Sequence, residues 1–156
     1  MRIRFLTITL FIMVLSLTAS CSKEQIETRI YSFCGETDVI TINNGLIIST
    51  DGLEKFIGGD LTFKGEEPLD VKSCVTKFFY YKDGVEDTIL SNSESVEGST
   101  KGSIISTDMG SISSENLFYS NNLEQVIKSL NLSITGFFMN GEKFEYNVVL
   151  DVEKAY

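Results

Sequence analysis

The chain has 156 residues with 22 acidic and 13 basic side chains, a formal charge of −9, and no histidine. This length fits one domain, and a composition of 42% hydrophobic and 22% charged residues excludes wholesale disorder. Without histidine the chain lacks Ser-His-Asp and Cys-His catalytic pairs and His-ligated zinc. The acidic balance argues against nucleic acid as a partner, because phosphates call for a basic patch.

The N-terminal segment has the three parts of a secretory signal. Arg2 and Arg4 form a basic start, residues 5–17 carry no charge, and small residues precede Cys21, after which the chain turns polar. The uncharged run is shorter than the roughly 20 residues that a transmembrane helix needs. We therefore expect residues 1–20 to be a signal peptide.

The sequence Leu17-Thr18-Ala19-Ser20-Cys21 resembles the lipobox of bacterial lipoproteins, with Thr18 where that family prefers leucine. The resemblance implies that Cys21 is lipidated and becomes the first residue of the mature chain, which is then held in the envelope membrane by its acyl chains. Ser22 stands where an aspartate would signal inner-membrane retention in that family, which favours the outer membrane. The alternatives are a plain secreted protein and an uncleaved anchor, and the orientation toward periplasm or exterior stays open.

Removal of the signal leaves a strongly acidic chain. Residues 1–20 contain two basic and no acidic side chains, so their loss takes the formal charge from −9 to −11. Such a charge keeps a protein soluble, and it also favours a cationic partner. We expect residues 21–29 to be a short tether and residues 30–156 to form a single β-rich domain.

Two cysteines remain in that domain, Cys34 and Cys74. In an oxidising exported compartment such a pair most simply forms a disulfide, which would add roughly 3–4 kcal/mol by closing a loop of about 40 residues. The alternatives are two buried thiols or a redox pair, although no Cys-x-x-Cys spacing supports the latter.

Three pairs of apolar segments are joined by steps that end in Asn-Gly or Asp-Gly, which is the strongest short signal for a β-hairpin. The pairs are Asp38 to Ile42 with Leu46 to Thr50, Val71 to Tyr81 with Val85 to Leu90, and Leu132 to Met139 with the segment that begins at Phe144. Shorter runs at Asp60 to Lys64 and Gly102 to Thr107 predict further strands. Antiparallel pairing is therefore the expected architecture.

One helix is predicted near residues 122–130, because Leu123, Val126, Ile127 and Leu130 form a single apolar stripe. Asn121 is placed to cap its start, with Glu124 in the capping-box position. After it, alternate residues from Phe144 to Val152 are apolar, which predicts a half-buried strand. The fold prediction is thus mainly β: an antiparallel β-sandwich, or a small barrel, with one short α-helix.

The candidate binding residues are the consecutive aromatics Phe78, Phe79, Tyr80 and Tyr81. Neighbours on a strand point to opposite faces, so either two of them form an exposed platform for a sugar or a protein, or both faces are covered. Acidic pairs such as Glu66-Glu67 and Glu86-Asp87, and the more distant Glu145 and Asp151, do not suit a carboxylate catalyst.

No metal or cofactor motif is present. We therefore predict a non-catalytic binding or accessory protein, anchored in the bacterial outer membrane and without a cofactor, that recognises a protein or a glycan. The alternatives are an acidic inhibitor or scavenger of a cationic protein, similar to lysozyme-inhibiting lipoproteins, and a carboxylate-based hydrolase.

Overall fold

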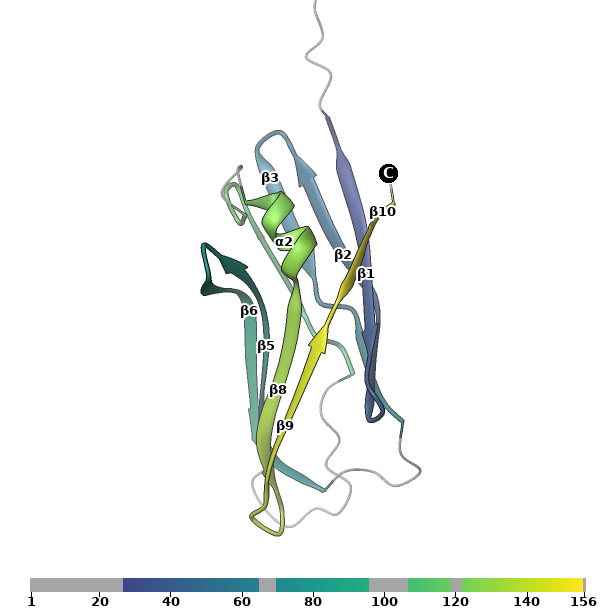
Figure 1. The fold of residues 1–156 in the computed structure, drawn as a ribbon, viewed down its shortest axis with the longest axis vertical. Helices are drawn as coiled ribbons and strands as arrows, with labels where there is room; N and C mark the ends of the chain where they lie inside the picture. Colours follow the sequence, from purple (N-terminus) through teal and green to yellow (C-terminus); the bar gives the residue numbers. More distant parts are fainter. Residues whose placement is uncertain (1–26, 65–69, 96–106, 119–121, 156) are drawn as a thin grey trace, which may run out of the picture.

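The computed structural model describes residues 27–64, 70–95, 107–118 and 122–155. These residues form two antiparallel sheets that share one core, with a single short helix (Figure 1). The first sheet has the order β10-β1-β2-β3-β7, with β4 also paired to β2, and the second has the order β6-β5-β8-β9. The predicted mainly β fold, a sandwich with one helix, is confirmed.

The strands range from four residues in β4 to twelve in β5. The first sheet contains β1 (Arg29–Glu36), β2 (Ile40–Thr50), β3 (Leu53–Ile57), β4 (Asp60–Phe63), β7 (Ser111–Ser114) and β10 (Asp151–Lys154). The second sheet contains β5 (Val71–Lys82), β6 (Val85–Ser95), β8 (Asn131–Phe138) and β9 (Lys143–Val149), and the helix is α2 (Leu123–Ser129).

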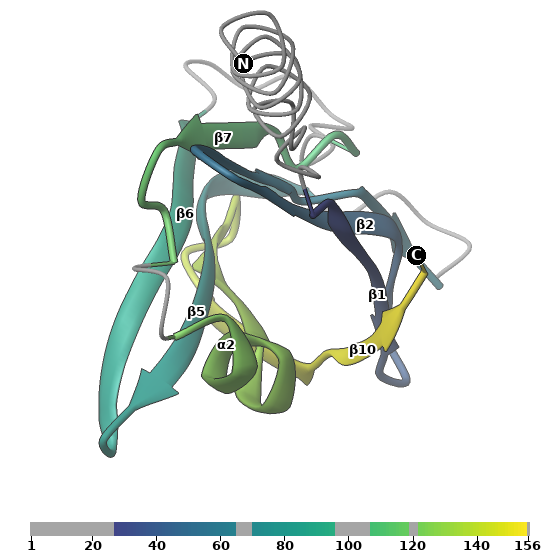
Figure 2. The same ribbon diagram turned by 90° about the horizontal axis from the view of Figure 1, so that it is seen from above.

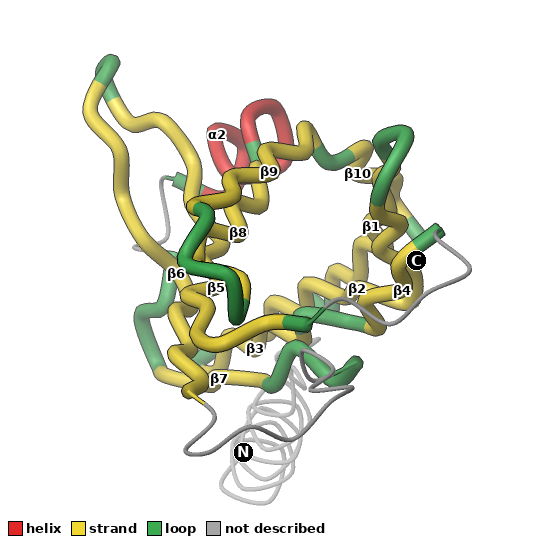
Figure 3. Tube along the Cα trace, turned by 90° about the horizontal axis from the view of Figure 1, so that it is seen from below, coloured by secondary structure: helices red, strands yellow, loops and turns green. Residues whose placement is uncertain are grey.

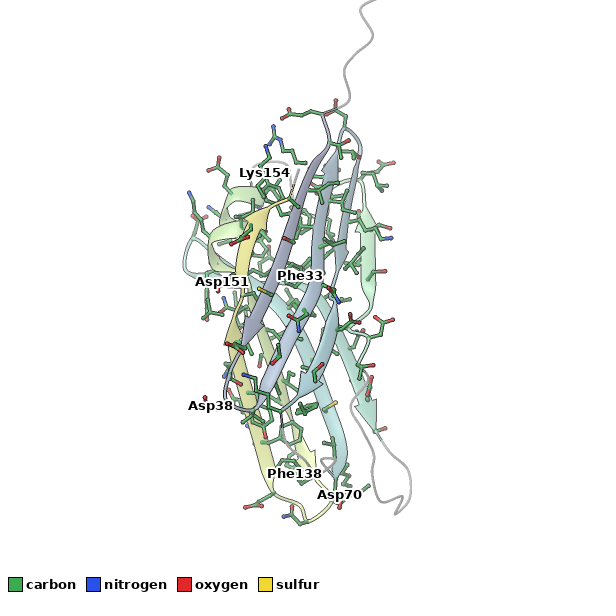
Figure 4. All side chains as sticks on the ribbon, turned by 90° about the vertical axis from the view of Figure 1, so that its right-hand side faces the viewer. Phe33, Asp38, Asp70, Phe138, Asp151 and Lys154 are labelled. Atoms are coloured by element: carbon green, nitrogen blue, oxygen red, sulfur yellow. The ribbon has the colours of Figure 1, made fainter. Side chains whose placement is uncertain are left out.

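The last predicted strand is divided between the two sheets. β9 pairs with β8, and after Leu150 the chain continues as β10 against β1. The Leu150 amide donates to the Leu130 carbonyl over 3.0 Å, and the Leu150 side chain is buried. The sheets are therefore joined along this edge, and seen end-on the strands surround the core (Figure 3). Along the side of the molecule β10 runs beside β1 (Figure 4).

Two of the three predicted hairpins form. Asp83 and Gly84 both have positive φ, 52° and 81°, as a two-residue type I′ turn between β5 and β6 requires. Between β8 and β9 only Gly141 is left-handed, with φ 88°, and its amide donates to the Phe138 carbonyl over 2.9 Å. This second connection is consequently a longer loop, which lies beside Asp70 at one end of the molecule (Figure 4).

The hairpin predicted at Asn43-Asn44-Gly45 is wrong, because β2 runs straight through this step. Asn44 has φ 59°, and its side-chain amide donates to an Asp60 carboxylate oxygen over 2.8 Å. At this point β2 exchanges one partner, β4, for another, β3. The positive φ of Asn44 therefore belongs to an irregularity within β2. The connection between β1 and β2 is formed instead by residues 37–39.

The centre of the core is aromatic. Phe56 stacks against Phe33 with ring centroids 5.2 Å apart and meets Phe78 edge-on at 5.0 Å. Gly45 makes room for the Phe33 ring, since a Cβ there would lie 2.1 Å from it. Each buried aromatic ring contributes roughly 1.5–3 kcal/mol through the hydrophobic effect, so these rings are a main source of cohesion between the sheets.

The N-cap of helix α2 lies one residue after the predicted cap, Asn121, which is outside the described residues. Asn122 is the N-cap residue, without a side-chain capping bond, and Val126 and Leu130 are fully buried in the shared core. The helix contacts β5 and β10, and seen from above it lies between them (Figure 2). Of the predicted strand Gly102 to Thr107, only Thr107 is described, and it belongs to no strand.

The predicted disulfide is wrong, because Cys34 and Cys74 are both free thiols. Cys34 is exposed on β1 of the first sheet, whereas Cys74 is buried on β5 of the second, within the core. The neighbouring Phe33 fills the inward position on β1, so the Cys34 side chain points away from the core and from Cys74. A disulfide needs Cβ atoms about 4 Å apart that face one another.

Candidate functional site

The aromatic run is divided between the two faces of β5. Phe78 and Tyr80, 1% and 2% exposed, point inward and belong to the core, so they are not part of a binding surface. Phe79 and Tyr81 point outward, and their exposed fractions are 7% and 49%. Of the four candidate residues, only Tyr81 is exposed to solvent.

The outward pair is held in place by its neighbours. The Lys77 ammonium lies 5.1 Å from the Phe79 ring centroid and forms a 2.6 Å ion pair with Glu86. The Tyr81 ring meets Phe79 edge-on at 5.6 Å, and the Tyr81 amide donates to the Ser129 hydroxyl of α2 over 3.2 Å. Phe79 is covered by these contacts and acts as the support against which Tyr81 is oriented.

Strand register places a set of polar side chains around these rings. Residues that are paired across antiparallel strands point to the same side of a sheet. The outward residues of β5, β6, β8 and β9, here called the outer face, are Ser73, Val75, Lys77, Phe79 and Tyr81; Glu86, Thr88, Ser91, Ser93 and Ser95; Asn131, Ser133, Thr135 and Phe137; and Lys143, Glu145, Asn147 and Val149.

A second exposed ring lies at the other end of the outer face. Phe137 is 48% exposed and is paired with Ser73, which precedes Tyr81 on β5 by eight residues, or about 27 Å of extended strand. Beside Phe137 is a hollow of about 300 Å³. Its lining includes the hydroxyls of Ser73, Ser93 and Thr135.

The charges of the outer face largely cancel. Lys77 pairs with Glu86 at 2.6 Å, and Lys143 lies 3.8 Å from Glu145. What remains between the two rings is the exposed Val75 and a set of neutral hydroxyl and amide groups that both donate and accept hydrogen bonds. Such a surface suits a neutral, hydroxylated ligand with apolar faces.

The other side chains considered from the sequence are placed apart from this surface or within other contacts. Asp87 accepts a 2.7 Å hydrogen bond from the Tyr80 hydroxyl, and Asp151 lies on the other sheet, across from Cys34. Cys21 and Glu66-Glu67 lie outside the described residues. Within the described ranges no three acidic or cysteine side chains are grouped as metal ligands, and no helix there is long and apolar enough to cross a membrane.

Comparison with protein-family models, with curated proteins and with solved structures gave no match. The case for function therefore depends on the residues of this chain. Sequence reasoning found the aromatic run but missed Phe137 and the rows of hydroxyls. The signal was the alternation of Ser133, Thr135 and Phe137, which acquires meaning only when the register sets these residues beside β5.

Proposed function

We propose that this protein is a lipid-anchored, non-catalytic binding protein of the bacterial outer membrane, and that the outer face is its binding surface for a neutral glycan. The observation that carries the proposal is the exposed Tyr81 ring, oriented by Phe79 on a sheet face covered by hydroxyl and amide groups. Aromatic rings combine a large apolar surface with little conformational entropy to lose on binding. Sugars present apolar C–H faces to such rings and hydroxyls to the groups around them.

The length of the face favours a chain of sugars over a single one. Tyr81 and Phe137 mark its two ends, about 27 Å apart along β5. The hollow beside Phe137 can accommodate one sugar ring, and the neutral groups between Phe137 and Tyr81 can form hydrogen bonds with the sugars that lie between. An extended oligosaccharide that lies along β5 reaches both aromatic side chains.

Lipid attachment through Cys21 would hold the protein at the membrane. The lipobox resemblance of residues 17–21 supports attachment through Cys21, and the predicted tether of residues 21–29 leads into β1, which begins at Arg29. Stable attachment takes more than one acyl chain, as lipoprotein processing supplies. A glycan-binding sandwich held in this way keeps its ligand close to the membrane.

The test of the binding surface uses neutral oligosaccharides of glucose, xylose and mannose. Tyr81→Ala and Phe137→Ala should each weaken binding about tenfold or more, since a stacked ring contributes on the order of 1–3 kcal/mol. Leu53→Ala is the matched control, because Leu53 is 50% exposed on the other sheet. The proposal fails if no oligosaccharide binds, or if Leu53→Ala weakens binding as much as Tyr81→Ala does.

The anchor is tested separately in cells. Wild-type protein should incorporate an alkyne-labelled fatty acid and sediment with outer membranes, and Cys21→Ser should lose both properties. Retention of label by Cys21→Ser would refute the lipid attachment without bearing on the outer face.

A further inference from the structure

The outer face has a row of apolar side chains that follows β5. Val75, Phe79 and Tyr81 are outward residues of this strand, and Phe137 of β8 lies at the far end of the row. These four residues are here called the apolar ridge, and three of them are exposed: Val75 by 42%, Tyr81 by 49% and Phe137 by 48%. Lys77 interrupts the ridge, but its ammonium lies 5.1 Å from the Phe79 ring centroid and is paired with a carboxylate of β6.

A row of hydroxyls runs along one side of the ridge on β6, the edge strand beside β5 (Figure 1). Its members are Thr88, Ser91, Ser93 and Ser95, which are all exposed, and strand register places each of them beside an outward residue of β5. Neighbouring strands are about 4.8 Å apart, so these hydroxyls stand directly next to the ridge. In the described part of the chain their side chains make no hydrogen bond, which leaves them available to a ligand.

Polar groups also follow the other side of the ridge, on β8. Thr135 is half-buried and is paired with Val75, and Asn131 is half-buried and is paired with Phe79. Ser133, between them, is buried. The ridge is therefore bordered on both sides by groups that donate and accept hydrogen bonds.

A flat chain of sugars has the same arrangement of apolar and polar groups. In β-1,4-linked glucose or xylose the ring substituents are equatorial, so C–H groups cover the two broad faces of the chain and hydroxyls line its two edges. The β-1,4 linkage keeps the chain extended, whereas an α-1,4 linkage turns a chain of the same sugar into a helix. Only the extended chain can stack on both end rings of the ridge and keep its edges beside the two polar rows.

A second copy of this chain matches the ridge less well. The chain has 22 acidic and 13 basic side chains, so two copies repel each other. The charged residues of the outer face are paired within it, Lys77 with Glu86 and Lys143 with Glu145, and so leave no net charge to attract a charged partner. The neutral character of the face therefore favours a neutral ligand.

We propose that the ligand of the outer face is a ribbon of β-1,4-linked sugars that lies along β5, an inference that rests on the proposed glycan-binding function. One broad face of the ribbon stacks on Tyr81, Val75 and Phe137. One edge forms hydrogen bonds with the hydroxyls of β6, and the other edge does so with the polar groups of β8. The linkage of the sugars, which sets the shape of the chain, is thus the property that this surface selects.

The test compares cellohexaose with maltohexaose by isothermal titration calorimetry, on full-length protein in a detergent without sugar groups. Both probes contain the same number of glucose residues and differ only in their linkage. We expect cellohexaose to bind about tenfold or more tightly than maltohexaose, because the extended chain alone reaches both Tyr81 and Phe137. Cellotriose is too short to reach both rings and should bind about tenfold or more weakly than cellohexaose.

The outcomes separate this inference from the proposed function. Equal affinity for cellohexaose and maltohexaose would overturn the ribbon but leave the glycan-binding surface in place. If no oligosaccharide binds, the proposed function fails and the inference fails with it. A dimer in analytical ultracentrifugation that Tyr81→Ala abolishes would assign the ridge to a second copy of the chain and would also overturn the inference.

Ser91→Ala and Ser93→Ala test the contacts of the ribbon edge with β6. Both side chains are exposed, so their truncation should leave the fold intact. Each variant should weaken cellohexaose binding about fivefold, as expected for the loss of one hydrogen bond. Ser113→Ala is the matched control, because Ser113 is an exposed serine on β7 of the other sheet and should not affect binding. Unchanged affinity in the Ser91→Ala/Ser93→Ala double variant would overturn the proposed position of the ribbon.

Discussion

Truncation of Phe78 tests the division of the aromatic run most directly. Phe78 is 1% exposed, and its ring centroid lies 5.0 Å from that of Phe56 and 6.0 Å from that of Phe33. Removal of a buried phenylalanine typically costs about 3–5 kcal/mol, and each aromatic pair adds about 0.5–1.5 kcal/mol beyond burial. We therefore expect Phe78→Ala to lower the free energy of unfolding by about 4–5 kcal/mol.

Tyr81→Ala is the matched comparison on the same strand. Because the tyrosine is already 49% exposed, its truncation removes about half the apolar burial of a core ring, and we expect a loss of about 1 kcal/mol. Urea denaturation followed by far-ultraviolet circular dichroism gives both values, provided that the denaturant slope is unchanged. A typical domain has only about 5–15 kcal/mol in total, so Phe78→Leu serves as a milder variant if Phe78→Ala does not fold.

We expect the two variants to differ in order as well as in magnitude. Phe78→Ala must lower the urea midpoint several times more than Tyr81→Ala does. Equal shifts for the two variants, or a larger shift for Tyr81→Ala, would contradict the assignment of Phe78 to the inward row and Tyr81 to the outward row of β5. The outer face would then lose its basis as well.

Three further predictions use the same protein. Gly45→Ala puts a Cβ 2.1 Å from the Phe33 ring and should cost about 1–3 kcal/mol in urea denaturation, and a neutral result would contradict the packing at this step. A thiol reagent should modify Cys34 but not Cys74 in the native chain, and both in denaturant without reductant; one or no thiol in denaturant would instead reveal a disulfide. Burial raises the pKa of Cys74 from 9.0 to about 11, so the unfolded thiol ionises first and the free energy of unfolding should fall as pH rises between these values. Cys74→Ala should lose this decrease, measured as the difference from wild type, and an identical pH dependence would refute it.

Local sequence patterns predicted an element correctly where one local cause, such as burial of one side or a required backbone angle, determines its structure. The apolar stripe of α2 and the alternation from Phe144 to Val152 follow from burial of one side, and both segments are helical or extended as predicted, although the extended segment is divided into β9 and β10. The Asp83-Gly84 turn follows from the need for two positive φ angles, which few residue pairs tolerate. From these signals a mainly antiparallel sandwich with one helix could be predicted.

The same local patterns misled where the decisive contact is distant. Asn44 and Gly45 satisfy a hairpin signal, but the Phe33 ring occupies the space over Gly45 and Asp60 holds the Asn44 side chain, so β2 continues. Cys34 and Cys74 appeared as a pair because no other partners remained. Their side chains point in different directions from different sheets, which is a property of tertiary structure.

The sequence by itself determined the fold class and the acidic charge, and it is the sole basis for the predicted signal peptide and lipid attachment, because these depend on composition and on neighbours a few residues apart. Tertiary structure alone decided which ring of the aromatic run is exposed, since strand alternation gives two faces without saying which is covered. It alone set Phe137 and the hydroxyls of β8 beside β5. Register and burial arise from pairing between segments far apart in the chain, and no local pattern contains them.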